Sequence, residues 1–390
     1  MGGRFAAALT ALTMLSALAA GALGGQAPAG ASVRSPAVAA STHEADLQAV
    51  SCPGPKLCIA VGRRALPHGQ APFSQRWNGS SWAVQEMPAP NAMDGYLVSV
   101  SCPARNDCTA VGGEARSVRQ SGPLAEQWNG RRWRITQDGD PAGAKAGELT
   151  GVSCASASNC VAVGQSQGRN RDLTLSERWN GRSWTVLAGA RLRRPAGFVG
   201  VNCTSRTCMA VGWIADPAQP GEVAMAEQLT KGVWRLVPTP VLTGSDLTLF
   251  YDTWCANARR CLAVGQSEEG GTTTALAEQW SGSRWTPQSL STANQVLSGI
   301  SCSSAAHCMA VGSGPTRPVS ELWTGAGWTS VPTAHIPGGS ADTLYQVSCP
   351  TATRCIAVGA RTNGGLGAVG TSLAEEWNGS SWRVLHTATP

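Results

Sequence analysis

A unit of about fifty residues recurs seven times along this chain, and that repeat limits the fold more than any other feature. Each copy has two cysteines five or six positions apart, then Ala-Val-Gly, then two positions five apart that hold tryptophan in six copies. The cysteine pairs use all 14 cysteines: Cys52/Cys58, Cys102/Cys108, Cys154/Cys160, Cys203/Cys208, Cys255/Cys261, Cys302/Cys308 and Cys349/Cys355. Features that occur in every copy belong to the scaffold, so function is to be sought among residues that occur once.

The sequence of one copy predicts four short β-strands. In the second copy, β-branched residues over 97–102 and the Cys-Thr-Ala-Val-Gly run over 108–112 predict two strands joined by a short loop. Residues 124–128 and 132–135 predict two more, and Asn129-Gly130 between them is typical of a tight hairpin. Each copy is therefore expected to form a small antiparallel sheet.

Four short strands cannot bury both faces alone, but seven such sheets stacked in a ring can. We predict an all-β, seven-bladed β-propeller over residues 42–390, and the sequence leaves open how the first and last blades close the ring. An open solenoid would need terminal copies with a polar outer face, and the end copies here are ordinary. The expected blades span about 42–90, 91–142, 143–192, 193–242, 243–291, 292–335 and 336–390.

The first 40 residues have the pattern of a secretory signal peptide and a short linker. A positive start that includes Arg4 precedes an apolar, Ala- and Leu-rich stretch, and small-residue cleavage sites such as Ala29-Gly30-Ala31 follow. The alternative is an uncleaved membrane anchor. Cleavage predicts a secreted, extracellular protein without membrane attachment.

Fourteen cysteines in a secreted chain predict seven disulfides, one within each blade, where each would staple the ends of its hairpin. Zinc is the alternative, but each pair would need two further ligands and the chain has only 5 histidines. We expect no cofactor and no metal. The net charge of +6 is spread without a basic stripe among aromatics, so we expect no nucleic-acid partner. A monomer is expected.

The repeat resembles those of the Asp-box propellers, the group that includes sialidases and photosystem II assembly-factor propellers. Here Cys-x-Ala-Val-Gly stands where their Gly-Trp-Ala-Val-Gly strand lies, and Trp-Asn-Gly-x-x-Trp replaces their Asp-Gly-Gly-x-x-Trp hairpin. The resemblance implies a propeller. The box aspartate is Asn, Ser, Thr or Lys here, no Arg-Ile-Pro occurs, and only 3 tyrosines are present, so sialidase activity is not expected.

Loop lengths predict which face of the ring carries function. The hairpin between the third and fourth strands never varies, whereas the stretch from the second cysteine to the first tryptophan runs from Cys308–Trp323 to Cys355–Trp377. Connections from second to third strand and from one blade to the next emerge on one face, here called the variable face. Loops on a rigid scaffold commonly carry binding sites. The opposite face, here called the disulfide face, is expected to be structural.

Residues that break the repeat gather in blades 3 to 5. We consider ten of them as a candidate ligand site: Arg191, Arg193, Arg194, Trp213, Asp216, Phe250, Tyr251, Asp252, Glu268 and Glu269. Aromatic, acidic and arginine side chains together suit carbohydrate or peptide binding. In the alternative interpretation the charges are solvated, and Phe250 and Trp254 fill a gap left where Leu229 replaces a tryptophan. Trp254 adjoins Cys255, which places it toward the disulfide face.

A repeated carboxylate occupies the third strand of six copies, with Gln75 in the first. These side chains are expected to be structural hydrogen-bond acceptors for backbone or indole N–H groups: Glu126, Glu177, Glu227, Glu278, Glu321 and Glu375. No catalytic motif stands out, so no catalytic residue is assigned.

We therefore expect a secreted, non-catalytic binding or scaffold propeller that recognises a cell-surface polysaccharide or a protein partner through its variable face. The alternative is an extracellular glycoside hydrolase or lyase that uses Asp252, Glu268 and Glu269. A third interpretation is a purely structural component of the cell envelope.

Overall fold

In the computed structural model, the described residues form twenty-eight β-strands. It describes residues 44–390, apart from 91, 118–119, 139–145, 169–171, 206, 217–220, 241, 243, 291–294, 335–341 and 362–368. The expected signal peptide lies outside the described residues. Within them, no helix of the length and apolarity needed to cross a bilayer is found.

The strands fall into seven consecutive groups of four, and each group forms one blade. Blades 1 to 4 comprise β1 (Ala45–Gly54), β2 (Leu57–Leu66), β3 (Gly69–Trp77), β4 (Trp82–Gln85); β5 (Asp94–Ala104), β6 (Asp107–Ser117), β7 (Gln120–Trp128), β8 (Trp133–Asp138); β9 (Gly147–Ser156), β10 (Asn159–Gln167), β11 (Asp172–Trp179), β12 (Trp184–Val186); β13 (Ala196–Cys203), β14 (Thr207–Ala215), β15 (Glu222–Thr230), β16 (Val233–Val237). Blades 5 to 7 comprise β17 (Leu247–Asn257), β18 (Arg260–Glu269), β19 (Thr272–Trp280), β20 (Trp285–Pro287); β21 (Val296–Ser304), β22 (His307–Ser313), β23 (Pro318–Trp323), β24 (Trp328–Ser330); β25 (Asp342–Thr351), β26 (Arg354–Arg361), β27 (Thr371–Trp377), β28 (Trp382–Leu385).

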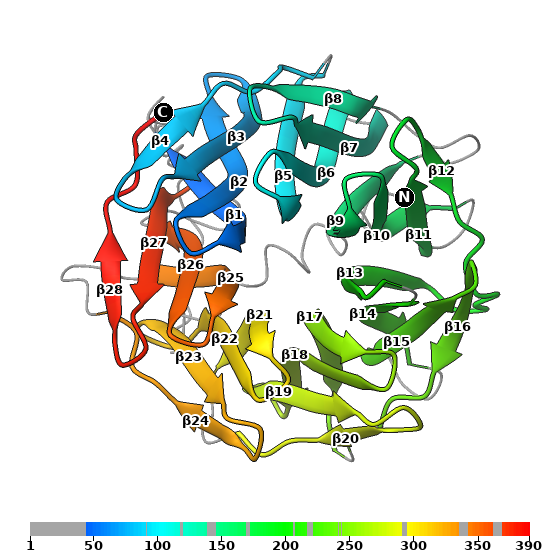
Figure 1. Cartoon of the computed structure of the whole chain (residues 1–390). Coiled ribbons are helices and arrows are strands. Elements are labelled where there is room, and N and C mark those ends of the chain that lie inside the picture. Colours follow the sequence, from blue (N-terminus) through cyan, green and yellow to red (C-terminus); the bar gives the residue numbers. More distant parts are fainter. Residues whose placement is uncertain are drawn as a thin grey trace, which may run out of the picture.

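Each blade is an antiparallel meander, and the seven blades form a ring (Figure 1) whose innermost strands line a central channel. The first strand of each blade lies innermost and the fourth lies at the rim. The predicted seven-bladed propeller is therefore confirmed.

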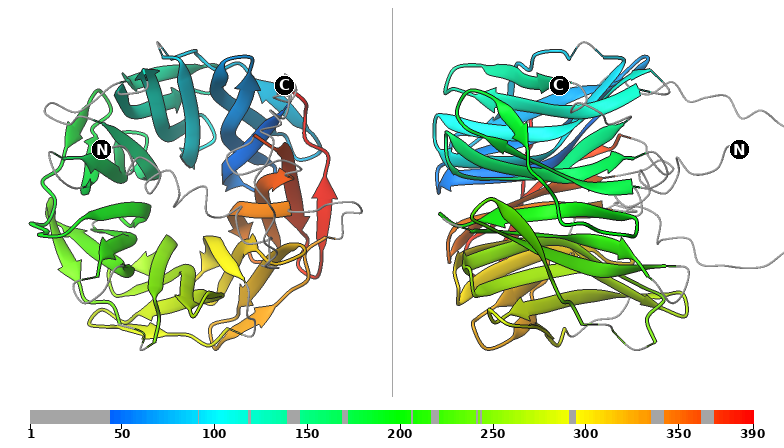
Figure 2. Two further views of the ribbon diagram at one scale, coloured as in Figure 1. Left: turned by 180° about the vertical axis from the view of Figure 1, so that it is seen from behind. Right: turned by 90° about the vertical axis from the view of Figure 1, so that its right-hand side faces the viewer.

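The two faces of the ring differ as expected, and Figure 2 shows the ring from behind and edge-on. On the disulfide face, each third-to-fourth-strand hairpin lies against the turn between the first two strands: a Cβ added to Gly130 would be 3.0 Å from Cβ of Asn106. On the variable face, the backbone N–H of Gln70, at the start of β3, donates to the carboxylate of Asp94, which begins the next blade.

The predicted disulfides all form within blades, and each links the first and second strands of its own blade. Their Cα–Cα distances run from 3.9 to 4.1 Å, and no cysteine in the chain is left free. The seven bridges are Cys52–Cys58, Cys102–Cys108, Cys154–Cys160, Cys203–Cys208, Cys255–Cys261, Cys302–Cys308 and Cys349–Cys355. The predicted pairing is confirmed.

The second cysteine of a bridge does more than staple a hairpin, which corrects the purely local role expected from the sequence. Cys58, Cys208 and Cys261 are only 1%, 7% and 1% exposed. Each packs in an apolar cluster that includes side chains of the preceding blade: blade 7 for Cys58, blade 3 for Cys208 and blade 4 for Cys261. These cysteines therefore belong to the core between blades.

The core lies between blades. Seven clusters of buried apolar residues each combine side chains from two adjacent blades, including the pair formed by blades 7 and 1. The two tryptophans of a hairpin contact each other, as in Trp77–Trp82 at 5.5 Å between ring centroids. The repeated tryptophans are therefore structural.

Phe198 packs in the same apolar cluster as Leu229. Phe198 replaces the leucine found at this place in most blades, and its ring lies 5.4 Å from that of Trp234 in the same cluster as Leu229. Phe250 instead packs on Trp285 between blades 4 and 5, and Trp254 packs beside blade 6. The expected gap-filling by Phe250 and Trp254 is thus not what the structure shows.

A β-bulge in every innermost strand explains the repeated glycine of Ala-Val-Gly. In blade 5 the pairing shifts at Tyr251, between Phe250 and Asp252. The shift brings the carbonyl oxygen of Leu249 to 1.9 Å from where a Cβ on Gly265 would lie. A side chain cannot occupy that space, so each blade needs glycine there.

The ring closes without a shared strand. A single parallel bridge pairs Ala45 of β1 with Thr371 of β27. The side chain of Gln75 accepts from the backbone N–H of Ala388 and donates to its carbonyl oxygen, at 3.0 and 2.8 Å. The last blade is thereby held to the first by contacts at the inner strand and at the rim.

Candidate functional site

The wall of the central channel is held together by hydrogen bonds between neighbouring blades. The acceptor in each bond is the side chain of the residue just before the first cysteine of one blade. The donor is the backbone N–H of the first cysteine in the next blade. Six of seven junctions have this bond, at 2.9–3.0 Å, with these acceptors: Ser51, Ser101, Ser153, Asn202, Ser301 and Ser348. The innermost strands thus form one continuous wall.

The seventh junction, between blades 5 and 6, is different. Trp254 occupies the acceptor position, and an indole offers no oxygen. Asp252, two residues earlier, bridges the junction instead: its carboxylate accepts from the N–H of Ile300 at 2.9 Å and from the side chain of Gln346 at 3.0 Å. Asp252 therefore joins blades 5, 6 and 7.

Burial raises the pKa of Asp252 to about 6, while hydrogen bonds from Ile300, Gln346 and Thr253 partly oppose that rise. All three donors stabilise the ionised carboxylate. The arrangement gives Asp252 a positioning role in the channel wall.

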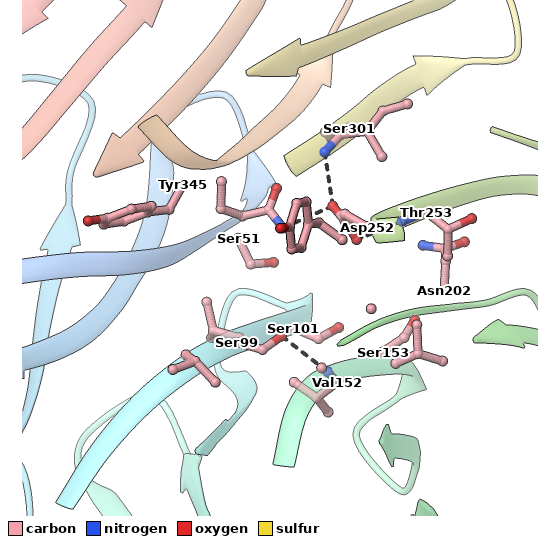
Figure 3. Close-up of a pocket in the computed structure, with 18 of the residues that line it drawn as sticks. Ser51, Ser99, Ser101, Val152, Ser153, Asn202, Asp252, Thr253, Ser301 and Tyr345 are labelled. Carbon is pink, nitrogen blue, oxygen red and sulfur yellow. Dashed lines mark hydrogen bonds between the residues drawn. The ribbon is translucent and has the colours of Figure 1, made fainter. Parts of the chain in front are cut away.

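The channel holds a pocket of about 220 Å³, and the innermost strands of all seven blades line it. Hydroxyl and amide side chains predominate, and Asp252 is the sole charged residue among those that line the pocket. Figure 3 shows Ser99 and Ser101 of blade 2, Ser153 of blade 3 and Asn202 of blade 4 around this space, with Asp252 across from Ser99 and Ser101. The pocket is a polar cavity with little charge.

Toward the variable face, buried polar groups interact within blade 1 and between blades 2 and 3. Asp46 pairs with Arg63 at 3.0 Å. The phenol of Tyr96 donates to Glu148 at 2.7 Å across the boundary of blades 2 and 3, and Gln165 donates to the same carboxylate at 2.7 Å. Burial raises the pKa of Glu148, so its two donors compensate for desolvation.

The expected blade 4 residues lie at the variable end of β13 and β14. Arg191 and Arg193 are exposed. The guanidinium of Arg194 donates to the carbonyl oxygen of Ala215 at 2.5 Å, which fixes the blade 3 to 4 connection. Asp216 follows β14, and its N–H donates to the carbonyl oxygen of Gly221 at 2.9 Å.

The aromatic members of the candidate site are buried. Trp213 and Tyr251 pack together with Leu249 and Val296. Phe250 is fully buried in the core between blades 4 and 5. The structure therefore brings Trp213 and Tyr251 together but leaves little of either ring on the surface.

The candidate carboxylates do not converge. Glu268 pairs with Leu247, and Glu269 is exposed at the end of β18. Leu247, the strand partner of Glu268, precedes Asp252 by five residues on β17. At about 3.3 Å per residue along a strand, Asp252 therefore lies roughly 15 Å from the position where Leu247 and Glu268 pair. Paired glycosidase carboxylates lie about 5–10 Å apart.

Two of the repeated third-strand carboxylates, Glu177 and Glu375, accept hydrogen bonds as expected, whereas both carboxylate oxygens of Glu126 are buried without a partner among the described residues. Glu375 accepts the backbone N–H of Ala334 from the preceding blade at 3.0 Å, and Glu177 accepts from the side chain of Gln137. Burial raises the pKa of Glu126 and Glu278 to about 8 and that of Glu227 and Glu375 to about 7. No group of three or more histidine, cysteine or acidic side chains suited to a metal is present among the described residues.

No protein-family model matches the chain. No curated protein matches it by sequence. Similar solved structures include the WD40 β-propeller domain of Doa1, at 9% identity and a TM-score of 0.52, with 83% of this chain and 92% of that chain covered. YCF48 from Cyanidioschyzon merolae matches at 12% identity and a TM-score of 0.51, with 83% and 95% covered. At such identities the likeness shows the β-propeller fold alone.

Proposed function

We propose that this protein is a secreted binding module that recognises a cell-surface polysaccharide or a protein partner through its variable face. Seven disulfides fit an oxidising, extracellular setting.

One observation carries the proposal. The connections on this face differ in length and sequence from blade to blade, yet hydrogen bonds anchor them to blades of the same architecture. Arg194 ties the connection before β13 to the end of β14, and the carboxylate of Asp246 accepts the N–H of Gly270 at 2.8 Å. Anchored loops lose little conformational entropy on binding, which favours recognition. Exposed Arg191, Arg193 and Glu269 supply charge beside these anchors.

The test compares two faces of one protein. The mature chain is incubated with insoluble polysaccharides and, separately, with immobilised envelope proteins. Replacement of Arg191, Arg193 and Glu269 by alanine is expected to lower retention at least about five-fold, which corresponds to roughly 1 kcal/mol of binding free energy. The matched control replaces exposed Arg105 and Arg131, on disulfide-face turns, and should bind normally. Equal loss in both variants would refute recognition by the variable face.

A further inference from the structure

The ring of residues before each blade's first cysteine presents hydrogen-bond donors to the channel. Each serine hydroxyl in it uses its oxygen to accept a backbone N–H, as Ser101 does from Cys154 and Ser153 does from Cys203. A hydroxyl that accepts in this way still has its own proton to donate. Asn202 likewise accepts through its oxygen, which leaves its NH₂ group to donate.

Trp254 stands out within this ring. It lines the channel where the other blades place Ser or Asn, and it packs on one side against the blade 6 cluster that contains Ile300 and Cys302. Unlike most tryptophans of this protein, which are buried, Trp254 keeps partial exposure. An indole beside hydroxyl and amide groups combines an apolar surface with a polar rim.

Two further polar atoms in the channel wall lack partners. The phenol oxygen of Tyr251, a residue that is 5% exposed, has no hydrogen-bond partner within the described residues, and neither has the buried hydroxyl oxygen of Ser298. Both residues line the pocket. Both oxygens are enclosed by protein, so a ligand in the channel would contact the ring of serine and asparagine groups and not these two atoms.

We propose that the channel pocket is a binding site for one neutral, hexose-sized sugar unit, with Trp254 beneath its C–H face and the surrounding serine and asparagine groups on its hydroxyls. The pocket volume of about 220 Å³ is below the range of drug-sized sites and suits a single ring. Asp252 disfavours an anion, and the absence of Lys and Arg from the residues that line the pocket leaves no positive charge to hold one. This site is separate from the variable face.

The experiment follows the indole N–H signal of Trp254 by NMR in the mature chain, assigned by its loss in Trp254→Ser. Glucose, galactose, mannose and N-acetylglucosamine are titrated separately, with sulfate as the anionic probe. At least one sugar is expected to shift the signal saturably, and sulfate is not.

Trp254→Ser supplies the acceptor found in five other blades, so it should fold normally while it weakens sugar binding at least about ten-fold by calorimetry. Val98→Phe, which narrows the channel from another blade, should weaken binding as well. The proposal would be overturned if no sugar shifted the signal, if sulfate alone did, or if both variants bound sugar as the native protein does.

Discussion

The hydroxyl oxygen of Ser348 accepts a hydrogen bond from the backbone N–H of Cys52, with 3.0 Å between the atoms and 296 positions of sequence between the residues. The same bond joins Ser51 to Cys102 one blade further on. The junction that closes the ring is therefore built like those between consecutive blades.

Removal of this acceptor should weaken the closure. Ser348→Ala leaves the N–H of Cys52 without its partner, and a loss of about 1–2 kcal/mol in the free energy of unfolding is expected. Denaturant unfolding gives that value. Ser80→Ala, on an exposed hairpin, is the control and should change stability by less than about 0.5 kcal/mol.

The bulge in the innermost strand makes the repeated glycine intolerant of a side chain. In Gly265→Ala the new Cβ would meet the carbonyl oxygen of Leu249, and a loss of about 3 kcal/mol or more is expected. A Cβ at Gly54 meets nothing within 4 Å, so Gly54→Ala should be neutral. Melting temperatures of the two variants decide the matter, and equal values would contradict this role of the bulge.

Each disulfide should stabilise its own part of the ring. Replacement of Cys102 and Cys108 by alanine removes one short-loop bridge, and about 2 kcal/mol is expected to be lost. The same change at Cys302 and Cys308 lies several blades away, so the two losses should add. Strong non-additivity would show that the bridges act across distant blades.

Stability should fall as pH rises from about 4.5 to 8. The folded-state pKa values of Glu126 and Glu278 are raised to about 8 by burial, so the folded protein binds protons that the unfolded chain releases above its ordinary pKa near 4.5. That stabilisation is fully present below pH 4.5 and is lost as pH passes 8. Glu126→Gln with Glu278→Gln should flatten the decline, measured as melting temperature against pH.

Glutamine should be tolerated in place of Glu126 and Glu278, because blade 1 already has Gln75 at the equivalent position. The neutral amide of Gln75 is hydrogen-bonded to Ala388. An unchanged pH profile in the double variant would mean that other groups govern the decline.

The repeat made the blades, disulfides and hairpins predictable, because each depends on residues close in sequence. The β-bulge could not be predicted in this way, because the need for glycine at position 265 arises from the backbone of the paired strand. Nor could the role of Asp252, whose partners Ile300 and Gln346 lie in other blades. The serine before most first cysteines was a visible signal of the channel ring that the sequence analysis passed over.

The burial of the second cysteines shows the same division between local and distant contacts. Which cysteines pair follows from their close spacing, and that was predictable. The packing of Cys58, Cys208 and Cys261 against the preceding blade depends on how the blades stack, so a single repeat could not indicate it.

The candidate site was harder to predict for a related reason. The ten candidate residues break the repeat and lie close together in sequence, in blades 3 to 5. In the folded ring, however, Asp252 lines the channel, whereas Arg191 and Glu269 are exposed elsewhere. Side chains close in sequence can thus serve different surfaces.

One measurement tests the central claim, that this propeller binds its ligand without transforming it. The mature protein is incubated with a panel of soluble and insoluble polysaccharides and with envelope proteins, and both retained protein and released sugar are quantified. The account predicts retention with no sugar release. Sugar release that Asp252→Asn or Glu268→Gln abolishes would contradict it and identify an enzyme, and failure to be retained by any polymer or protein would contradict it as well.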